Sequence, residues 1–439
     1  MSTAPASTTA EVQVAVIGGG PAGLAAATAA ARAGATTVLV DEGAALGGRL
    51  RYRIQPVVTD RPPPVAPSAL VTSLAAEAAE AGVSIRTGAT AWGLFAGNVL
   101  AIAGGQATEL RAGAVVLATG STDLPWPFPG GTLPGVFTAR AVQILLNRHR
   151  VRPGRRFVVV GVGSEAAEVA EDIRLAGGEI VATADPTAGD TIAAEGVDGV
   201  RAVTVNGARH TADVVVVAVG RQVDAALAIM AGADVAFASA LGGQVPLRDD
   251  RLRSTITGLF VADDAASPAD VATALTEGRY AGVNAAALLG LVDAATQAAA
   301  RATYDAAVAD HRARAGALIQ RGVPGQPDHE RGLPPPRDGA DLITDPTSSP
   351  PPAHVCRCGE VGAAAVVTAI AAGARTVNDV KRQTRAGMGL CQGVFCVRPI
   401  AELLHAHARV PLAGIAPMTA RPPVRPMALD RLVGPADTD

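Results

Sequence analysis

The chain has 439 residues, which at about 100 to 200 residues per domain predicts two to four domains. Hydrophobic residues make up 49% of it, enough to build cores, so the chain is not broadly disordered. A formal net charge of -3 and an aromatic content of 3% argue against nucleic-acid binding through bulk electrostatics or base stacking.

The N-terminal region is apolar but does not have the pattern of a membrane or export signal. Met1–Glu11 has no basic residue, and the apolar stretch Val12–Val40 is interrupted by Gly18–Pro21 and by Arg32. No run approaches the roughly 20 clean apolar residues of a membrane span. We therefore expect a soluble, cytoplasmic protein without a transmembrane segment.

A strand, a glycine-rich turn, a helix and a second strand follow one another near the N-terminus. Val12–Ile17 predicts a buried parallel strand, which leads into the turn Gly18-Gly19-Gly20-Pro21-Ala22-Gly23. An alanine-rich helix should follow to about Ala33, and Thr36–Val40 predicts a second buried strand that ends at Asp41.

Each part of this βαβ unit suits a dinucleotide. In such a turn the first glycine permits the tight bend, the second lets the backbone approach a pyrophosphate, and the third lets the helix pack on the strand. The helix N-terminus offers free N–H groups to phosphates, and Asp41 can accept a hydrogen bond from an adenosine ribose. The unit therefore predicts a dinucleotide-binding site.

FAD is the dinucleotide that the rest of the chain favours. A second glycine pair, Gly47-Gly48, follows the ribose acid, and the predicted strand Ala114–Leu117 ends in the small-residue turn Ala118-Thr119-Gly120. The predicted strand Gly258–Ala262 leads through Asp263 and Asp264 to a helix, which suits a contact of Asp264 with the ribityl chain or a phosphate. The candidate cofactor-binding residues are Gly18, Gly20, Pro21, Ala22, Gly23, Asp41, Glu42, Gly48, Arg49, Thr119, Gly120 and Asp264.

A second unit of the same kind begins at Phe157. The strand Phe157–Val160 leads into the turn Gly161–Ala166, after which a helix and the strand Glu179–Ala182 are expected. Glu165 puts a carboxylate beside the position that a pyrophosphate would occupy. The chain after the second strand is too short for another full crossover helix, so this domain is truncated. NAD(P), another nucleotide, and a structural domain without a ligand all stay open for the Gly161 turn.

The four cysteines lie close together in sequence, as a Cys-x-Cys pair and a Cys-x4-Cys pair. Four thiolates can hold a [2Fe-2S] cluster or a structural zinc. Zinc sites usually place the two cysteines of a pair two to four residues apart, which disfavours zinc for Cys-x-Cys. A cluster is favoured, and zinc or disulfides remain alternatives. The proposed metal ligands are Cys356, Cys358, Cys391 and Cys396.

These patterns predict an α/β fold with two dinucleotide-binding domains and a small helical [2Fe-2S] domain. The predicted organisation is an FAD-binding domain at 1–125 and 250–300, a truncated dinucleotide-binding domain at 126–249, a helix and proline-rich linker at 301–352, a [2Fe-2S] domain at 353–410 and a C-terminal tail at 411–439.

Several segments resemble one family, the FAD-binding α subunits of multi-subunit, dye-linked amine and amino-acid dehydrogenases. They are Val115–Gly120, Pro125–Val136, Val151–Gly161 and Val355–Cys396, the last with TRAGMGLCQG at Thr384–Gly393. The family includes opine oxidase, D-hydroxyproline and proline dehydrogenases and hydrogen cyanide synthase, with sarcosine oxidase α more distant. The cysteine segment resembles bacterioferritin-associated ferredoxin domains.

The resemblance implies a thioredoxin-reductase-like flavoprotein fold with FAD and a [2Fe-2S] cluster. It also implies that the β subunit of the complex is a partner flavoprotein of the D-amino-acid-oxidase type, often joined by a small ferredoxin-like subunit. Arg49 stands where the family commonly has glutamine, and Asp263 stands where glycine precedes the acid. An FMN at a subunit interface is a further option that the sequence leaves open.

The expected function is electron transfer. Residues 1–355 contain no cysteine, so the dithiol chemistry of thioredoxin or glutathione reductases is excluded for this chain. Amine oxidation is expected in the partner, with an opine, D-hydroxyproline, proline, glycine or sarcosine-like substrate, and no catalytic residue is assigned here. The alternatives are a self-sufficient NAD(P)H:acceptor oxidoreductase and a structural assembly subunit.

Overall fold

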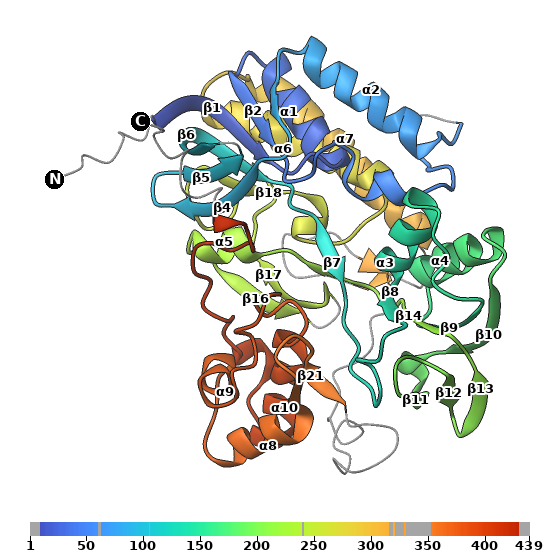
Figure 1. The fold of residues 1–439 in the computed structure, drawn as a ribbon. Helices are drawn as coiled ribbons and strands as arrows, with labels where there is room; N and C mark the ends of the chain where they lie inside the picture. Colours follow the sequence, from blue (N-terminus) through green and yellow to red (C-terminus); the bar gives the residue numbers. More distant parts are fainter. Residues whose placement is uncertain are drawn as a thin grey trace, which may run out of the picture.

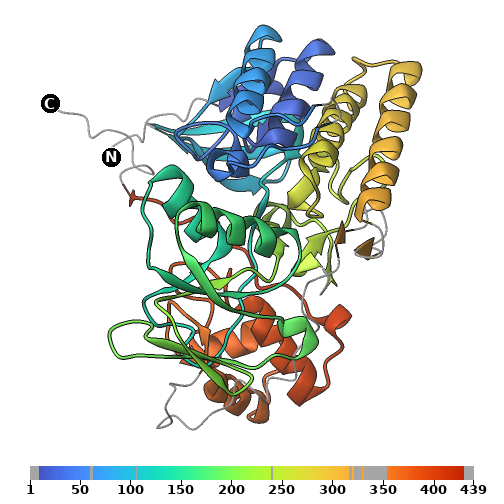
Figure 2. The ribbon, with the colours of Figure 1, turned by 90° about the vertical axis from the view of Figure 1, so that its right-hand side faces the viewer.

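Two sheet-containing lobes and a small helical module make up the molecule. The computed structural model describes residues 9–59, 63–104, 106–238, 241–315, 319–320, 329–330 and 353–429. The first lobe lies uppermost in Figure 1, and the second lobe and the module lie side by side beneath it. Figure 2 shows the same stacking from the side. Within the described residues, every helix is too short or too polar to cross a bilayer.

The first lobe is built on a seven-stranded mixed sheet. Its N-terminal strands are short apolar runs that pair in parallel, as expected for strands covered on both faces. The spatial order is β3 (Ser84–Arg86), β2 (Thr37–Val40), β1 (Thr9–Ile17), β6 (Gln106–Leu117), β5 (Val99–Gly104) and β4 (Thr90–Phe95), and β18 (Leu259–Val261) pairs with β6. Because β18 joins this sheet from far along the chain, the lobe is discontinuous in sequence.

Close helix packing holds the late part of the chain against the early part. α1 (Pro21–Arg32) packs on α6 (Val271–Leu288), and α2 (Pro67–Glu80) and α7 (Ala294–Ala315) lie to either side. A Cβ at Gly278 would clash with the Ala22 carbonyl, and one at Gly282 with the Ala26 carbonyl. These two glycines therefore let the two helix backbones approach each other.

The second lobe is a shortened version of the first. Its four parallel strands are β10 (Glu179–Ala184), β9 (Arg156–Val160), β14 (Val214–Val217) and β8 (Val136–Thr138), with helices α3 (Ala139–Gln143) and α4 (Ser164–Leu175). A separate three-stranded antiparallel sheet follows β10 in this lobe. It consists of β11 (Ile192–Glu195), β12 (Ala202–Val205) and β13 (Ala208–Thr211).

Short strands connect the lobes and the module. β7 (Ser121–Asp123) and β15 (Arg221–Val223) form an antiparallel pair between the lobes. α5 (Ala226–Met230) packs beside β4, and the hairpin β16 (Val235–Ala238) and β17 (Gly243–Pro246) reaches the module. The module contains β21 (His354–Cys356), β22 (Val361–Gly362), α8 (Ala363–Ala371), α9 (Val377–Thr384) and α10 (Val397–Ala408) around its own apolar core.

The structure differs from the sequence predictions at several boundaries. β6 begins at Gln106, before the predicted start at Ala114, because its first half pairs with β5 in the antiparallel part of the sheet. The sequence predicts a helix over Ala269–Ala286, whereas α6 begins at Val271, because Asp270 is its N-cap and accepts a hydrogen bond from the Thr273 N–H. Most of the predicted proline-rich linker lies outside the described residues.

Candidate functional site

A cavity of about 540 Å³ opens where β1, β6 and β18 end, and it extends to the N-terminus of α4 in the second lobe. Parallel α/β sheets bind ligands at the carboxyl ends of their strands, so the location is the expected one. Every candidate cofactor residue lines the cavity except Gly23, which lies beneath the turn. A Cβ at Gly23 would clash with the Gly18 carbonyl, so this glycine allows α1 to pack closely on β1.

The glycine turn leaves room for a ligand backbone. Gly18 has a φ of +110°, and a Cβ there would clash with the Ala118 carbonyl of the neighbouring turn. Gly20 behaves differently, because the nearest atom to a Cβ at this position is the Gly48 Cα at 3.9 Å. The space above Gly20 therefore suits a close approach by phosphate groups next to the N-terminus of α1.

Asp41 is held in position by backbone N–H groups. Its carboxylate accepts from the Gly19 N–H at 2.5 Å and from the Gly43 N–H at 2.7 Å. Both carboxylate oxygens keep further lone pairs, so the side chain can still accept from a ribose hydroxyl. Glu42 follows it and also lines the cavity.

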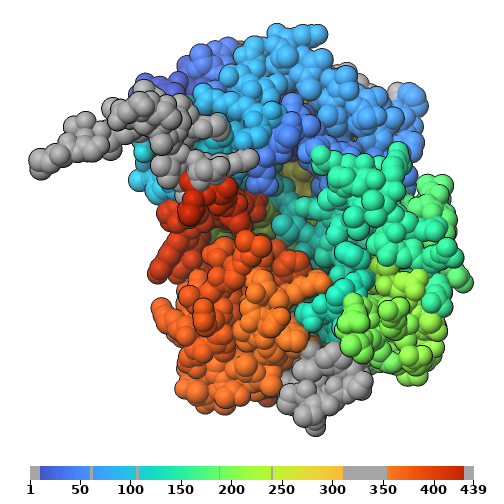
Figure 3. Space-filling view, viewed as in Figure 1, coloured from blue at the N-terminus to red at the C-terminus, as the bar shows by residue number. Residues whose placement is uncertain are grey.

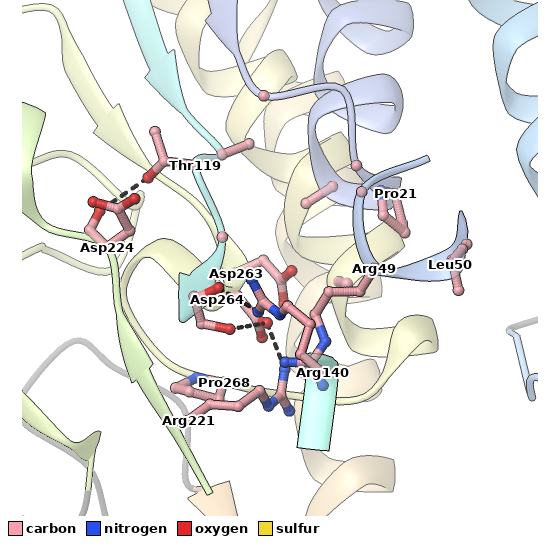
Figure 4. A pocket seen from close by; sticks show the side chains of 18 of the residues that line it. Pro21, Arg49, Leu50, Thr119, Arg140, Arg221, Asp224, Asp263, Asp264 and Pro268 are labelled. Atoms are coloured by element: carbon pink, nitrogen blue, oxygen red, sulfur yellow. Dashed lines mark hydrogen bonds and ion pairs between the residues drawn. The ribbon is translucent and has the colours of Figure 1, made fainter. Parts of the chain in front are cut away.

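An ion-pair network crosses from the first lobe to the second, and Figure 4 shows three of its members, Arg49, Arg221 and Asp264. Arg49 Nη2 lies 2.6 Å from Glu165 Oε1, and Arg221 Nε lies 3.0 Å from the same oxygen. Arg221 also pairs with Asp264, which accepts from Ser121 Oγ at 2.7 Å. These contacts join the loop after β2, the start of α4, β15 and the turn after β18.

The two acids after β18 have opposite electrostatic environments. Burial acts to raise the pKa of Asp264, but the positive charges of Arg221 and Arg49 outweigh it and lower that pKa. Burial, followed by the charges of Asp264 and Glu277, raises the pKa of Asp263 well above its ordinary value. Asp263 also has a positive φ of 54°, a backbone conformation that glycine adopts most readily. The pKa values of these two neighbouring acids are therefore shifted in opposite directions.

Several cavity-lining polar atoms have room for a ligand partner. Among the described residues, Arg49 Nη1, Tyr52 Oη and Asp263 Oδ1 are buried without a hydrogen-bond partner. Buried polar groups normally have partners, so these atoms fit a polar ligand. Together with the open glycine turn and Asp41, they make the residues compatible with bound FAD.

The second glycine turn, at Gly161–Ala166, contains the carboxylate of Glu165. Glu165 lies in the first turn of α4, where a pyrophosphate would need free N–H groups and positive potential. Its ion pairs with Arg49 and Arg221 hold it at the boundary between the lobes. This arrangement engages two arginines that could otherwise bind NAD(P) phosphates.

The cysteines are brought together as two pairs. Cys358 Sγ lies 3.6 Å from Cys391 Sγ, and Cys356 is hydrogen-bonded to Cys396. That bond lowers the pKa of Cys356 to about 5, and all four thiols are free of disulfides. Cys356 and Cys396 are buried, whereas Cys358 is exposed.

The pairing of the four sulfurs suits a [2Fe-2S] cluster. Within the described part of the chain, no group of three or more His, Cys, Asp or Glu side chains is placed to hold a single metal ion. Two sulfur pairs match a [2Fe-2S] cluster, in which four thiolates are shared between two irons. Gly389 is needed beside this site, because a Cβ there would meet Cys358 Sγ at 2.5 Å. His405 and His407 lie in the last turn of α10, and we do not assign them as metal ligands.

Hydrogen bonds join the cysteine module to the second lobe and to the short strands beside it. Gln222 Nε2 donates to the Val394 carbonyl at 2.7 Å, next to the second cysteine pair. Arg357 Nη2 donates to the Val136 carbonyl at 3.1 Å. Gln244 Nε2 donates to the Ile415 carbonyl at 2.6 Å, on the chain that leaves the module. The module is therefore held close to the cavity through side chains on short strands.

Sequence reasoning missed several cavity residues. Arg140 lies over the Tyr52 ring at 6.0 Å, and both line the cavity. Asp224 accepts through its carbonyl from Thr119 Oγ1 at 3.0 Å and also lines it. Arg425 reaches the cavity from the segment expected to be a tail. No sequence motif marks these positions. Among the cavity residues that were missed, Arg221 alone could have been suspected, because it closely follows the strand β14.

Comparison with known proteins places the chain in a family. The pyridine nucleotide-disulphide oxidoreductase family model matches residues 12–188, and the BFD-like [2Fe-2S] binding domain model matches residues 354–406. The A subunit of opine oxidase from Agrobacterium tumefaciens (strain Ach5) is 30% identical over 477 residues, covering 95% of this chain and 90% of that protein. The chain belongs to the family of opine oxidase A subunits. As a member of it, the chain is an FAD-dependent oxidoreductase with a [2Fe-2S] cluster.

Solved structures show that this member of the opine oxidase family has the expected fold. L-proline dehydrogenase from P. horikoshii matches 97% of this chain and 80% of its own, with a TM-score of 0.78 and 24% identity. Thioredoxin reductase from T. acidophilum matches 63% of this chain and 98% of its own, with a TM-score of 0.50 and 18% identity. The prediction of a thioredoxin-reductase-like flavoprotein with an added [2Fe-2S] domain is confirmed.

Proposed function

We propose that the chain is the flavin and iron–sulfur electron-transfer subunit of a cytoplasmic, hetero-oligomeric amine or amino-acid dehydrogenase. The substrate would be an opine, D-hydroxyproline, proline, glycine or a sarcosine-like amine. It would be oxidised on the β subunit, which would be a partner flavoprotein of the D-amino-acid-oxidase type, and a small ferredoxin-like subunit is a second candidate partner. The naming of the A. tumefaciens relative as one subunit of an oxidase supports the assembly.

The observation that carries this proposal is a short connection between the cavity and the cysteine module. Gln222 on β15 donates to the Val394 carbonyl beside the second cysteine pair. Asp224, two residues later, lines the cavity. When bound, FAD exchanges one or two electrons and the cluster exchanges one at a time, so the pair can link two-electron oxidation to one-electron carriers.

We assign each group of cavity residues to a part of the FAD molecule from its position in the cavity. The turn Gly18–Gly23 with Pro21 and Ala22 would hold the pyrophosphate, and Asp41 and Glu42 would face the adenosine ribose. Gly48, Arg49, Thr119 and Gly120 would line the middle of the site, and Asp264 its ribityl side. The first lobe, at 1–125 and 250–300, is then the FAD-binding domain, with 126–249 as the truncated domain and 353–410 as the cluster domain.

Glu165 favours this function over a self-sufficient NAD(P)H:acceptor oxidoreductase. Its carboxylate pairs with Arg49 and Arg221 at the start of α4, so both cations are already engaged where a nicotinamide dinucleotide phosphate would bind. Since all four cysteines lie in the module, the cavity has no thiol pair for disulfide chemistry. No catalytic acid or base is assigned to this chain, and amine oxidation is placed in the partner.

The test is anaerobic stopped-flow absorbance on the tagged chain purified with and without its copurifying subunits. L-Proline, D-hydroxyproline, glycine, sarcosine and an opine are mixed with each preparation, and NADH and NADPH are mixed separately. The proposal predicts that one amine bleaches this flavin only when the partner is present. A Cys391→Ser variant should still accept electrons at the flavin but should reduce a one-electron dye more slowly. Fast bleaching by NADH alone, with no copurifying partner, would overturn the proposal.

A further inference from the structure

The segment Met418–Arg425 connects the cluster module to the cofactor cavity. Figure 3 shows the chain after the module, in red, filling the space between the module and the first lobe. At its beginning, Met418 packs beside Gly387, four residues before Cys391, and beside Gly393, between Cys391 and Cys396. A Cβ on either glycine would meet the Met418 side chain at 2.9 and 2.7 Å, respectively.

The other end of this segment is bound to the first lobe. The Val424 N–H donates to the Trp92 carbonyl on β4 at 3.0 Å. Arg425 forms an ion pair with Asp224, and its Nε lies 3.6 Å from Glu42 Oε2. The Arg425 and Asp224 side chains are 26% and 10% exposed, so the pair is largely withdrawn from water. Val424 and Arg425 both line the cavity.

Arg425 reaches one particular end of that cavity. Asp41 and Glu42 follow β2 there, and the Ala89 N–H donates to the Asp41 carbonyl at 3.0 Å. Ala89 and Ala91 add an apolar wall to the same end. A ribose acid beside a small apolar surface suits an adenosine, whereas the isoalloxazine end lies toward Asp264 and α6.

We propose that Arg425 is an adenosine-binding residue of the FAD site, supplied by the C-terminal segment. Its planar guanidinium can stack on adenine through a face or donate to the ribose, while Asp224 binds one of its N–H groups. It also offsets the charges of Glu42 and Asp224, which would otherwise repel the pyrophosphate of the cofactor. This inference rests on the proposed placement of the adenosine half at Asp41.

The arrangement also couples FAD binding to docking of the cluster module. The same eight residues touch the loop of the second cysteine pair at one end and the cavity at the other. A ligand that binds only when the segment is seated stabilises the seated state by mass action. Occupation of the adenosine end therefore favours the docked position of the module.

The first experiment titrates FAD and, separately, ADP into the FAD-depleted full-length protein and measures heat of binding. Arg425→Ala should weaken both ligands by about 10-fold, the loss expected for a hydrogen bond to a charged group. Arg421→Ala, an exposed arginine on the same segment, is the matched control and should leave both affinities unchanged. Iron content and the circular dichroism spectrum should be the same in both variants.

The possible outcomes distinguish the proposed role of Arg425 from the proposed placement of the adenosine half at Asp41. If Asp41→Asn weakens ADP and Arg425→Ala does not, the adenosine site stands and the role of Arg425 is wrong. If neither variant changes ADP binding, the placement of the adenosine half itself is wrong. Should Arg425→Ala fail to fold, hydrogen exchange of the unmodified protein decides the question. ADP should slow amide exchange across Met418–Arg425, and unchanged exchange at saturating ADP would overturn the proposal.

Discussion

Arg49 and Glu165 form a 2.6 Å ion pair that joins the two lobes across the cofactor cavity. The Arg49 and Glu165 side chains are 23% and 16% exposed, so water screens the pair less than it would at the surface. Arg221 shares the same carboxylate at 3.0 Å. Glu165 therefore compensates two cations that face the cavity from opposite lobes.

Removing this carboxylate should destabilise the protein and loosen the boundary between the lobes. For Glu165→Gln we expect a loss of about 1 to 3 kcal/mol in the free energy of unfolding, because two partly buried arginines lose a charged acceptor. Glu171→Gln is the matched control on the same helix, since its 3.6 Å pair with Arg174 is about half exposed. It should cost about 1 kcal/mol or less. Equal losses in urea unfolding for the two variants would contradict this explanation.

Asp263 should make stability depend on pH. The raised pKa means that the folded state holds a proton that the unfolded state releases near pH 4, so this residue costs stability progressively as the pH rises above that value. Asp263→Asn mimics the protonated acid and should raise the melting temperature by a few degrees at pH 8 and by much less at pH 5. Melting curves across this range check the expectation. A stabilisation that stays constant with pH would mean that proton binding is not its cause.

Asp264 should make the stability depend on pH in the opposite sense. Despite burial, Arg221 lowers its pKa, so its contribution to stability is present above the ordinary pKa of an aspartate and is lost as the pH falls below it. Asp264→Asn should therefore be destabilising at neutral pH, by about 3 to 5 kcal/mol for a broken buried pair, and the deficit should shrink toward pH 3. Chemical unfolding at several pH values measures it, with Asp249→Asn at an exposed ion pair as the control.

These residues also show where sequence reasoning succeeds and where it stops. The Gly18 turn and Asp41 could be predicted because a dinucleotide site imposes a local order of strand, glycines, helix and acid. The cysteine pairs could be predicted for the same reason, since spacing within a few residues restricts the metal. The Arg49–Glu165 contact joins positions 116 residues apart, and no local pattern encodes it. The position of Arg425 at the cavity is harder still to predict from sequence, because its segment has no hydrophobic periodicity and its role depends on where the module docks.

The buried pair on α10 gives a test of how the cluster module is stabilised. Arg398 Nε lies 3.0 Å from Glu402 Oε1, and the side chains are 3% and 6% exposed. Arg398→Ala removes the charged partner seen in this contact from a buried carboxylate, so we expect a loss of about 3 to 5 kcal/mol in module stability. Arg382→Ala, at an exposed pair with Asp379 in the same module, should cost about 1 kcal/mol or less. Because the cysteines are held by this core, Arg398→Ala should also release iron at a lower denaturant concentration than the parent or Arg382→Ala. The visible absorbance of the cluster during urea titration measures this, and matching iron loss in both variants would show that the α10 pair does not support the cluster site.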